Sequence, residues 1–382
     1  MRLLHDQPIT SCIEHVSLTH IELPLKECYR GLKATGPGFR DTILVALHTH
    51  DGRVGVGECA PPPGPELKAT IEQCWQELTA TIPSLLLGQP VMDIETCEAR
   101  LAHDNGLHRS SRAGVETAYW DLIGKFQERS LASLLGADEA RLMMGIEPSV
   151  EIGPYPTMVD TIRAMEPHQE EGIRTFVIGL TPGLDLELME SLRNHFPDCQ
   201  FAADAGGRFD RSQVSLFHRL DELDLLWIDD PLPAADTEGM AGLQAAMETP
   251  LCVDASQTHL LETGGCRLAR LSVQGAGGLN AARRLHDICE ANHVSCRVCT
   301  SPESGVGLAQ SLALAALPNC KDPSGLAPLA RWFADLFVKP PIELDDLLHG
   351  RLRVTSRPGL GHAVDWVRVH EHRVKHAEFP IQ

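Results

Sequence analysis

One complete repeat of the fold can be read in residues 225–256, which have the sequence LLWIDDPLPAADTEGMAGLQAAMETPLCVDAS. A short apolar strand around Trp227-Ile228 ends at Asp229-Asp230-Pro231, and a helical segment follows. A second apolar strand, Cys252-Val253, ends at Asp254. The two strands are about 25 residues apart, a spacing that is typical of β/α units. This stretch therefore predicts parallel strands that alternate with helices.

The same spacing extends in both directions. Seven apolar strands recur from about residue 149, with one shorter step, and their centres are Val150-Glu151-Ile152, Phe176-Val177-Ile178, Phe201-Ala202-Ala203, Trp227-Ile228, Cys252-Val253, Leu271-Ser272-Val273 and Arg297-Val298. Seven strands at this period predict a (β/α) barrel. In a barrel the reactive residues lie at the carboxyl ends of the strands, on the loops that lead into the helices. Those loops are where we expect the functional site.

The first part of the chain has a different pattern, of mixed α+β type. Residues Ile13 to Leu25 alternate like a strand, and two further runs, Thr42 to Leu47 and Val54 to Cys59, are joined by the hairpin signal Asp51-Gly52. Apolar residues at helical spacing predict a helix over Ser111 to Glu128.

These patterns predict three segments. We expect an α+β domain over residues 1–135 and the barrel over 145–322. We expect the last segment, 323–382, to return to the first domain. A chain of 382 residues is long enough for two such units.

Composition excludes several classes of protein. The chain carries 33 Lys and Arg against 52 Asp and Glu, a net charge of −19 that repels nucleic acid. We find no apolar run of membrane-spanning length, and Met1 to Ser11 lacks the apolar stretch of a signal peptide, so we expect a cytoplasmic protein. The twelve cysteines are scattered, mostly in apolar runs, and are not expected to form disulfides.

Three acidic residues carry the strongest functional signal. Asp204, Asp229 and Asp254 are 25 residues apart, so each ends one strand at the same height in the barrel. Carboxylates brought together raise one another's pKa values, and such a cluster persists chiefly when a cation neutralises it. Oxygen ligands without His or Cys favour Mg²⁺ or Mn²⁺. The alternative is that each Asp is an ordinary loop residue or helix N-cap.

The sequence resembles the enolase superfamily, and within it the muconate cycloisomerase subgroup. The resemblance runs over most of the chain, and it is carried by Gly57-Glu58-Cys59, Arg112 to Asp121, Ala203-Asp204-Ala205, Trp227 to Pro231, Thr249 to Asp254, Gly277 to Arg284 and Glu303 to Gly307. It implies an N-terminal capping domain, a (β/α)7β barrel, and a divalent metal held by the third, fourth and fifth strands.

The resemblance also assigns individual residues. It places the metal on Asp204, Asp229 and Asp254, with Asp230 as a competitor because the fourth-strand ligand is usually Glu in relatives. The Gly-rich segment Gly31 to Gly38, with Gly36, Gly38 and the following Arg40, matches the loop that covers the substrate.

The chemistry that the resemblance implies is removal of a proton next to a carboxylate, with the metal holding the enediolate. Relatives use lysines as bases, but the three matching positions here are Val177, Gly179 and Ser272, and none of these side chains accepts a proton at neutral pH. Three residues are candidates to replace the lysine bases, and they are Cys299 as a thiolate, Glu303 and His259.

The sequence thus predicts a divergent, metal-dependent isomerase or lyase that acts on a small carboxylate without the family lysines. The alternative is a catalytically silent relative that binds a carboxylate ligand or a protein partner. In either case we expect a homo-oligomer that binds neither nucleic acid nor membrane.

Overall fold

The computed structural model describes residues 11–26, 38–63, 66–91, 93–102, 106–181, 183, 185–326, 332–333 and 337–381. Most of the predicted substrate loop, including Gly36, lies outside these residues, and only its last residue, Gly38, lies inside them. No helix in the described part of the chain is both long and apolar enough to cross a membrane.

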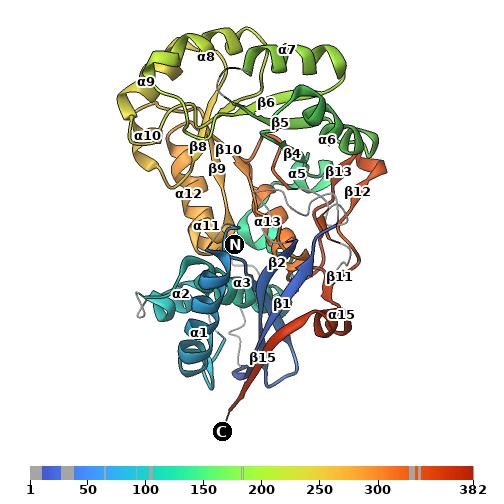
Figure 1. The fold of residues 1–382 in the computed structure, drawn as a ribbon. Coiled ribbons are helices and arrows are strands. Elements are labelled where there is room, and N and C mark those ends of the chain that lie inside the picture. Colours follow the sequence, from blue (N-terminus) through green and yellow to red (C-terminus); the bar gives the residue numbers. More distant parts are fainter. Residues whose placement is uncertain are drawn as a thin grey trace.

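The N-terminal domain is built on an antiparallel sheet with the strand order β15-β1-β2-β3 (Figure 1). Its strands are β1 (Ile13–Pro24), β2 (Phe39–Thr49), β3 (Val54–Cys59) and the C-terminal β15 (Arg373–Pro380). The predicted hairpin is confirmed, since β2 pairs with β3 in the register Ile43 to Cys59. The last strand of the chain pairs with the first, so the C-terminal segment completes this sheet.

Five helices follow β3, and they are α1 (Leu67–Leu86), α2 (Ile94–Ala102), α3 (Arg109–Phe126), α4 (Leu131–Leu135) and α5 (Glu139–Met144). The predicted central helix is confirmed as α3, which is buried along most of its length. Helix α3 packs very closely on β3, because a Cβ atom added to Gly57 would lie 2.0 Å from the carbonyl oxygen of Gly114. Glycine at position 57 permits this contact.

The barrel begins after α5. Its parallel strands are β4 (Ser149–Ile152), β5 (Thr175–Gly179), β6 (Gln200–Asp204), β7 (Ile228–Asp229), β8 (Leu251–Asp254), β9 (Leu268–Leu271) and β10 (Ser295–Val298), hydrogen-bonded in chain order. The segments between and after them are α6 (Met158–Glu170), α7 (Asp185–His195), η2 (Arg211–Gln213), α8 (Val214–Asp221), α9 (Thr237–Ala246), α10 (Thr258–Glu262), α11 (Val273–Ala276), α12 (Leu279–Ala291) and α13 (Gly305–Ala315). Figure 1 shows α6 to α9 around the outside of these strands.

A two-residue segment occupies the place of an eighth strand. Ser324 forms a parallel bridge with Pro148, and Gly325 forms one with Cys299. These residues therefore connect the end of β10 to the start of β4. The predicted (β/α)7β barrel with an α+β capping domain is confirmed.

The predicted position of the sixth barrel strand is too late in the chain. The predicted centre Leu271-Ser272-Val273 lies at the end of the sixth barrel strand, because β9 ends at Leu271. Ser272 is instead the N-cap of α11, and its hydroxyl accepts a hydrogen bond from the Gly275 amide at 3.1 Å. The apolar pattern continues across this boundary, which hid the end of the strand.

The inside of the barrel holds a layer of side chains from alternate strand positions. Its apolar members are Val177, Ala202, Trp227, Cys252 and Leu268. Successive residues of a strand point to opposite faces of the sheet. The residue two positions after each member of this layer therefore also points into the barrel, one step closer to the carboxyl end of its strand. This layer therefore forms the floor of any site at the strand ends.

The C-terminal segment adds two small sheets before it reaches β15. These consist of β11 (Val338–Lys339) with β14 (Ala363–Val364) and β12 (Leu344–Asp345) with β13 (Arg351–Leu352), accompanied by η3 (Asp346–Leu348) and α15 (Trp366–Glu371).

Candidate active site

A cavity of about 310 Å³ opens at the carboxyl ends of three barrel strands, β4, β9 and β10. Its chemically active lining consists of Glu151, Arg270, Ser272, Cys299 and Glu303. The capping domain reaches the same loops, because Gln274 after β9 hydrogen-bonds to the backbone of Glu58 and Ala60. This is the position at which a barrel carries its active site.

Arg270 forms an ionic fork at the edge of this cavity. Its Nη1 atom lies 2.6 Å from Asp229 Oδ1, and its Nη2 atom lies 2.7 Å from Asp230 Oδ2. Charge-assisted bonds of this kind are the strong ones among protein hydrogen bonds. Two of the predicted metal-site acids are therefore held by one guanidinium.

Asp229 has further nitrogen neighbours. Its Oδ2 atom accepts a 2.9 Å hydrogen bond from the indole of Trp227 and lies 3.5 Å from Arg297 Nη1. Burial acts to raise the pKa of Asp229, but the positive charges of Arg270 and Arg297 outweigh it and hold the pKa below its usual value. Asp229 is therefore an ionised carboxylate that is satisfied by protein groups.

The other two predicted ligands lie on neighbouring strands. Asp204 ends β6, and its pKa is raised, first by burial and then by the charge of Asp229. The Asp254 carboxylate at the end of β8 accepts hydrogen bonds from the amide and hydroxyl groups of Ser256. Asp254 is thus partly used as a turn-forming residue, as the alternative interpretation of the sequence anticipated.

The resemblance to the enolase superfamily implies a divalent metal here, and the arrangement of these carboxylates does not fit one. A shared ion needs its ligand oxygens at about 2.0–2.6 Å, but Arg270 holds the Asp229 and Asp230 carboxylates. Among the described residues, the one group of His, Cys, Asp and Glu ligand atoms that all lie within 4.8 Å of one another is His286, Asp287 and Glu290 on α12. The structure thus does not bring Asp204, Asp229 and Asp254 together in the way the metal prediction requires.

Glu303 is a buried acid in the cavity wall, just before α13. Burial, and then the charge of Glu58, raise the pKa of Glu303 to about 8, against the opposing charge of Arg40. Glu58 is firmly held, since it accepts hydrogen bonds from the backbone amides of Ser304 at 2.9 Å and Gly307 at 2.8 Å. Glu303 is therefore a neutral carboxylic acid at pH 7, able to donate a proton.

The sequence missed Glu151, which lies in β4 with its carboxylate open to the cavity. Burial by the protein on its other sides raises the pKa of Glu151. The positive charge of Arg297 opposes this effect, and the negative charges of Asp229 and Asp204 add to it. Glu151, Arg270 and Arg297 share a signal that could have revealed them. Each is a charged residue in a short strand of a parallel sheet, where strands otherwise read as apolar.

The three predicted proton-transfer groups have different outcomes. Cys299 and Glu303 both line the cavity. Burial, however, raises the pKa of Cys299 to about 11, so the predicted thiolate does not form at neutral pH. His259 is exposed on α10, interacts with the carbonyl of Ala234 at 3.2 Å and does not line the cavity.

Gly38 and Arg40, the predicted loop residues that the structure describes, do not line the cavity. Gly38 adopts a φ of +88°, a conformation that favours glycine. Arg40 is buried, and its Nε atom donates a 2.8 Å hydrogen bond to the carbonyl of Pro302, next to Glu303. Arg40 therefore positions the Glu303 loop.

The positions at which the resemblance placed lysines surround the same region. Val177 belongs to the apolar floor, Gly179 pairs with Asp204 at the end of β5, and Ser272 lines the cavity. A Cβ atom at Gly179 would lie 2.6 Å from the nitrogen of Pro154, which leaves no space for a longer side chain. None of these three residues offers a group that titrates near neutral pH.

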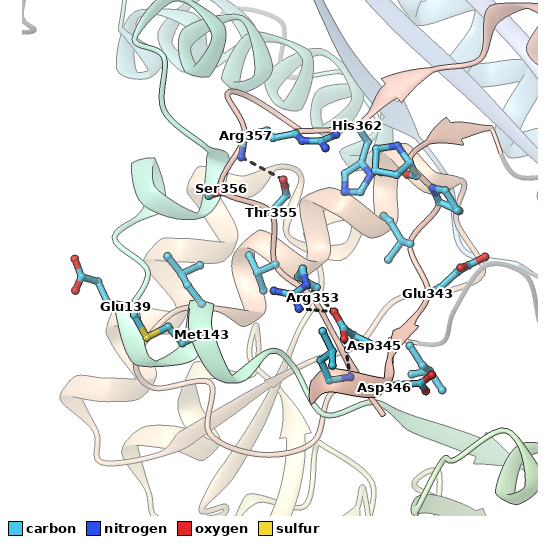
Figure 2. Close-up of a pocket in the computed structure, with 17 residues that line it drawn as sticks. Glu139, Met143, Glu343, Asp345, Asp346, Arg353, Thr355, Ser356, Arg357 and His362 are labelled. Carbon is cyan, nitrogen blue, oxygen red and sulfur yellow. Dashed lines mark hydrogen bonds and ion pairs between the residues drawn. The ribbon is translucent and has the colours of Figure 1, made fainter. Parts of the chain in front are cut away.

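A second cavity, of about 950 Å³, lies beside α5 and the C-terminal segment (Figure 2). Figure 2 shows Arg353 ion-paired with Asp345 there, at 2.6 Å. Helix α5 leads into the start of β4, so this cavity is next to the chain that enters the barrel, where residues mainly serve stability. The predicted site residues that the structure describes do not line it.

Comparisons with known proteins agree with the fold described above. Residues 158–368 match the family described as enolase C-terminal domain-like, and residues 34–136 match the mandelate racemase / muconate lactonizing enzyme N-terminal domain. An N-succinylamino acid racemase of Thermus thermophilus is 30% identical over 91% of this chain and 94% of its own. An o-succinylbenzoate synthase of Bacillus subtilis is 29% identical over 91% and 93%.

Solved structures give the same result for the fold. A member of the enolase superfamily from Listeria innocua superposes with a TM-score of 0.85 at 25% identity and covers 97% of this chain and 100% of its own. The muconate lactonizing enzyme of Pseudomonas fluorescens, with muconolactone bound, has a TM-score of 0.82 at 20% identity, over 95% and 100% of the two chains.

Proposed function

The chain belongs to the enolase superfamily, a family of isomerases and lyases, and we propose that it acts on a small carboxylate substrate in the strand-end cavity by a route that uses no lysine base. The observation that carries this proposal is the lining of the cavity, which combines a fixed cation, Arg270, with two carboxyl groups of different character, Glu151 and Glu303. Such a lining can bind an anion and also move a proton.

Removal of a proton next to a carboxylate places negative charge on the carboxylate oxygens. A positive group that already lies beside those oxygens stabilises the developing charge. Arg270 is such a group, because its guanidinium lines the cavity while the ion pairs with Asp229 and Asp230 fix its position. The substrate carboxylate is therefore expected on the cavity side of Arg270.

Proton transfer then falls to the two glutamates. Glu151 opens to the cavity with a raised pKa, which makes its carboxylate a stronger base than an ordinary one. Glu303 has a pKa of about 8 and holds a proton at pH 7. We assign Glu151 as the base and Glu303 as the acid, a division of roles that an isomerisation or an elimination requires.

The relatives support the substrate class. Their names, o-succinylbenzoate synthase and N-succinylamino acid racemase, each refer to a compound that carries carboxylates. The cavity volume of about 310 Å³ also favours a small molecule.

The test is exchange of the proton next to the carboxylate in D2O, followed by NMR over a panel of N-acylamino acids, dipeptides and aromatic succinyl carboxylates. We expect the wild type to exchange at least one of them, and we expect Glu151→Gln and Glu303→Gln to slow the exchange by about 10²–10⁴-fold. Glu190→Gln, on the exposed face of α7, is the matched control and should leave the rate unchanged.

The second candidate function is ligand binding without turnover. It is favoured by Val177, Gly179 and Ser272, which remove every titratable group from the expected lysine positions. A carboxylate that raises the Tm of the wild type but shows no exchange under any condition would favour this function over the enzyme.

A further inference from the structure

We propose that the guanidinium of Arg270 takes the place of a divalent cation among the strand-end carboxylates, so that this site is complete without a metal ion. The inference goes beyond the proposed function, because it concerns how the acidic cluster is neutralised and holds whether or not the cavity supports turnover.

The register of the strands brings Arg270 to the cluster. Arg270 pairs with Asp254 in the parallel ladder between β9 and β8, and the neighbouring ladder pairs Asp229 of β7 with Cys252 of β8. Because side chains alternate along a strand, Leu268 faces the barrel interior and Arg270 faces the same side two residues later. The long side chain of Arg270 then reaches from β9 across β8 to Asp229 on β7.

The contacts use the atoms that a metal would need. Arg270 binds Asp229 Oδ1 at 2.6 Å and Asp230 Oδ2 at 2.7 Å, and the second oxygen of Asp229 accepts from Trp227 at 2.9 Å. The Asp229 and Arg270 side chains are 5% and 21% exposed, so little water competes for these bonds. The Asp229 carboxylate thus has a nitrogen donor on each oxygen.

The backbone at Asp230 is shaped for this arrangement. Its φ is +41°, a left-handed conformation that non-glycine residues seldom adopt. Residues in such conformations persist where the surrounding structure holds them, often at functional sites. Here the conformation belongs to the residue whose carboxylate completes the fork of Arg270.

The charges balance within the group of residues that the two arginines contact. Asp229 and Asp230 supply two negative charges, and Arg270 with the nearby Arg297 supplies two positive ones. A divalent ion at the same place would meet a guanidinium within contact distance of its ligands and be repelled. The guanidinium of Arg270 therefore supplies the positive charge that the sequence predicted for a metal ion.

The test measures Mn²⁺ binding to the full chain, freed of metal with EDTA, by the EPR signal of free Mn²⁺. We expect the wild type and Asp229→Asn to bind the same amount of Mn²⁺, because no ion is held at Asp229. We also expect that neither Mg²⁺ nor EDTA changes the Tm of the wild type. Mn²⁺ held by His286, Asp287 and Glu290 on α12 is identified separately, because His286→Ala removes that ion alone. Stoichiometric Mn²⁺ that is lost in Asp229→Asn and kept in His286→Ala would overturn the proposal.

A second measurement removes the guanidinium. Arg270→Gln should lower the Tm by several degrees, because two carboxylates lose their partner, and added Mg²⁺ should recover part of that loss. Arg270→Lys keeps the charge and should lose less. If Arg270→Gln has the wild-type Tm with and without Mg²⁺, the guanidinium does not neutralise the cluster and the proposal fails. If that variant does not fold, the wild-type titration decides the question.

Discussion

The Cζ atom of Arg297 lies 4.3 Å from the centroid of the Trp227 indole ring, inside the barrel. Arg297 is fully buried and also donates hydrogen bonds to the carbonyl of Pro323 and the hydroxyl of Ser149, both at 3.1 Å. It therefore links β10 to β4 and to the segment that closes the ring. In the ladder between β9 and β10 Arg297 pairs with Arg270, so the two charged residues lie at the same height in the barrel.

The first prediction concerns the charge of Arg297. Arg297→Met should lower the free energy of unfolding by about 3–5 kcal/mol, because Asp229 loses a buried counter-charge and Ser149 loses its donor. Urea denaturation followed by circular dichroism measures the change. Arg219→Met, at an exposed position on α8, is the control and should differ from wild type by less than about 0.5 kcal/mol. A small effect of Arg297→Met would mean that the buried guanidinium is dispensable.

The second prediction concerns the contact between β3 and α3. Gly57→Ala should destabilise the protein by about 1–3 kcal/mol or more, because its Cβ would overlap the Gly114 carbonyl in a packed core. Gly242→Ala is the matched control, since a Cβ there meets no atom within 4 Å and replaces glycine inside helix α9. We expect this control to be neutral or more stable by up to about 1 kcal/mol. Equal stability of the two variants would contradict the close packing.

The third prediction follows from the raised pKa of Glu303. Between its ordinary pKa of 4.5 and its folded value of about 8, Glu303 is ionised in the unfolded chain and protonated in the folded one. Unfolding then releases a proton, so the contribution of Glu303 to stability is fully present below pH 4.5 and is lost as the pH rises through 8. Wild type should lose stability over this window relative to Glu303→Gln, whose amide does not titrate.

Urea unfolding at several pH values between 5 and 9 measures this difference. If the two proteins lose stability in parallel over that range, Glu303 does not titrate as its burial implies.

The fourth prediction concerns Cys299. With a pKa of about 11, its thiol should react slowly with iodoacetamide at pH 7 and faster as the pH approaches that value. Cys299→Ser should keep any proton exchange that the wild type shows. Peptide mass spectrometry after timed labelling reports the first property, and the D2O assay reports the second. Rapid labelling at pH 7 together with loss of exchange in the serine variant would restore the thiolate as the base.

The sequence alone determined the architecture of this protein. A repeat of about 25 residues, with one shorter step, sets the height of the barrel strands, because each β/α unit returns the chain to the same level. That regularity placed Asp204, Asp229 and Asp254 correctly at the ends of β6, β7 and β8. It failed at Ser272 because the alternation of the apolar residues Leu271 and Val273 continues past the end of β9 into α11.

Only the tertiary structure decided what neutralises those acids. Spacing along the chain shows which residues reach the strand ends, but it does not show which cation approaches them from another strand. Arg270 reaches Asp229 across an intervening strand, and the pKa of Glu303 is raised by burial and then by the charge of Glu58, which comes from the capping domain. Both facts depend on contacts between segments far apart in sequence. Burial and charge act through space, so the chemistry of this site follows from the packing and not from the spacing of its residues.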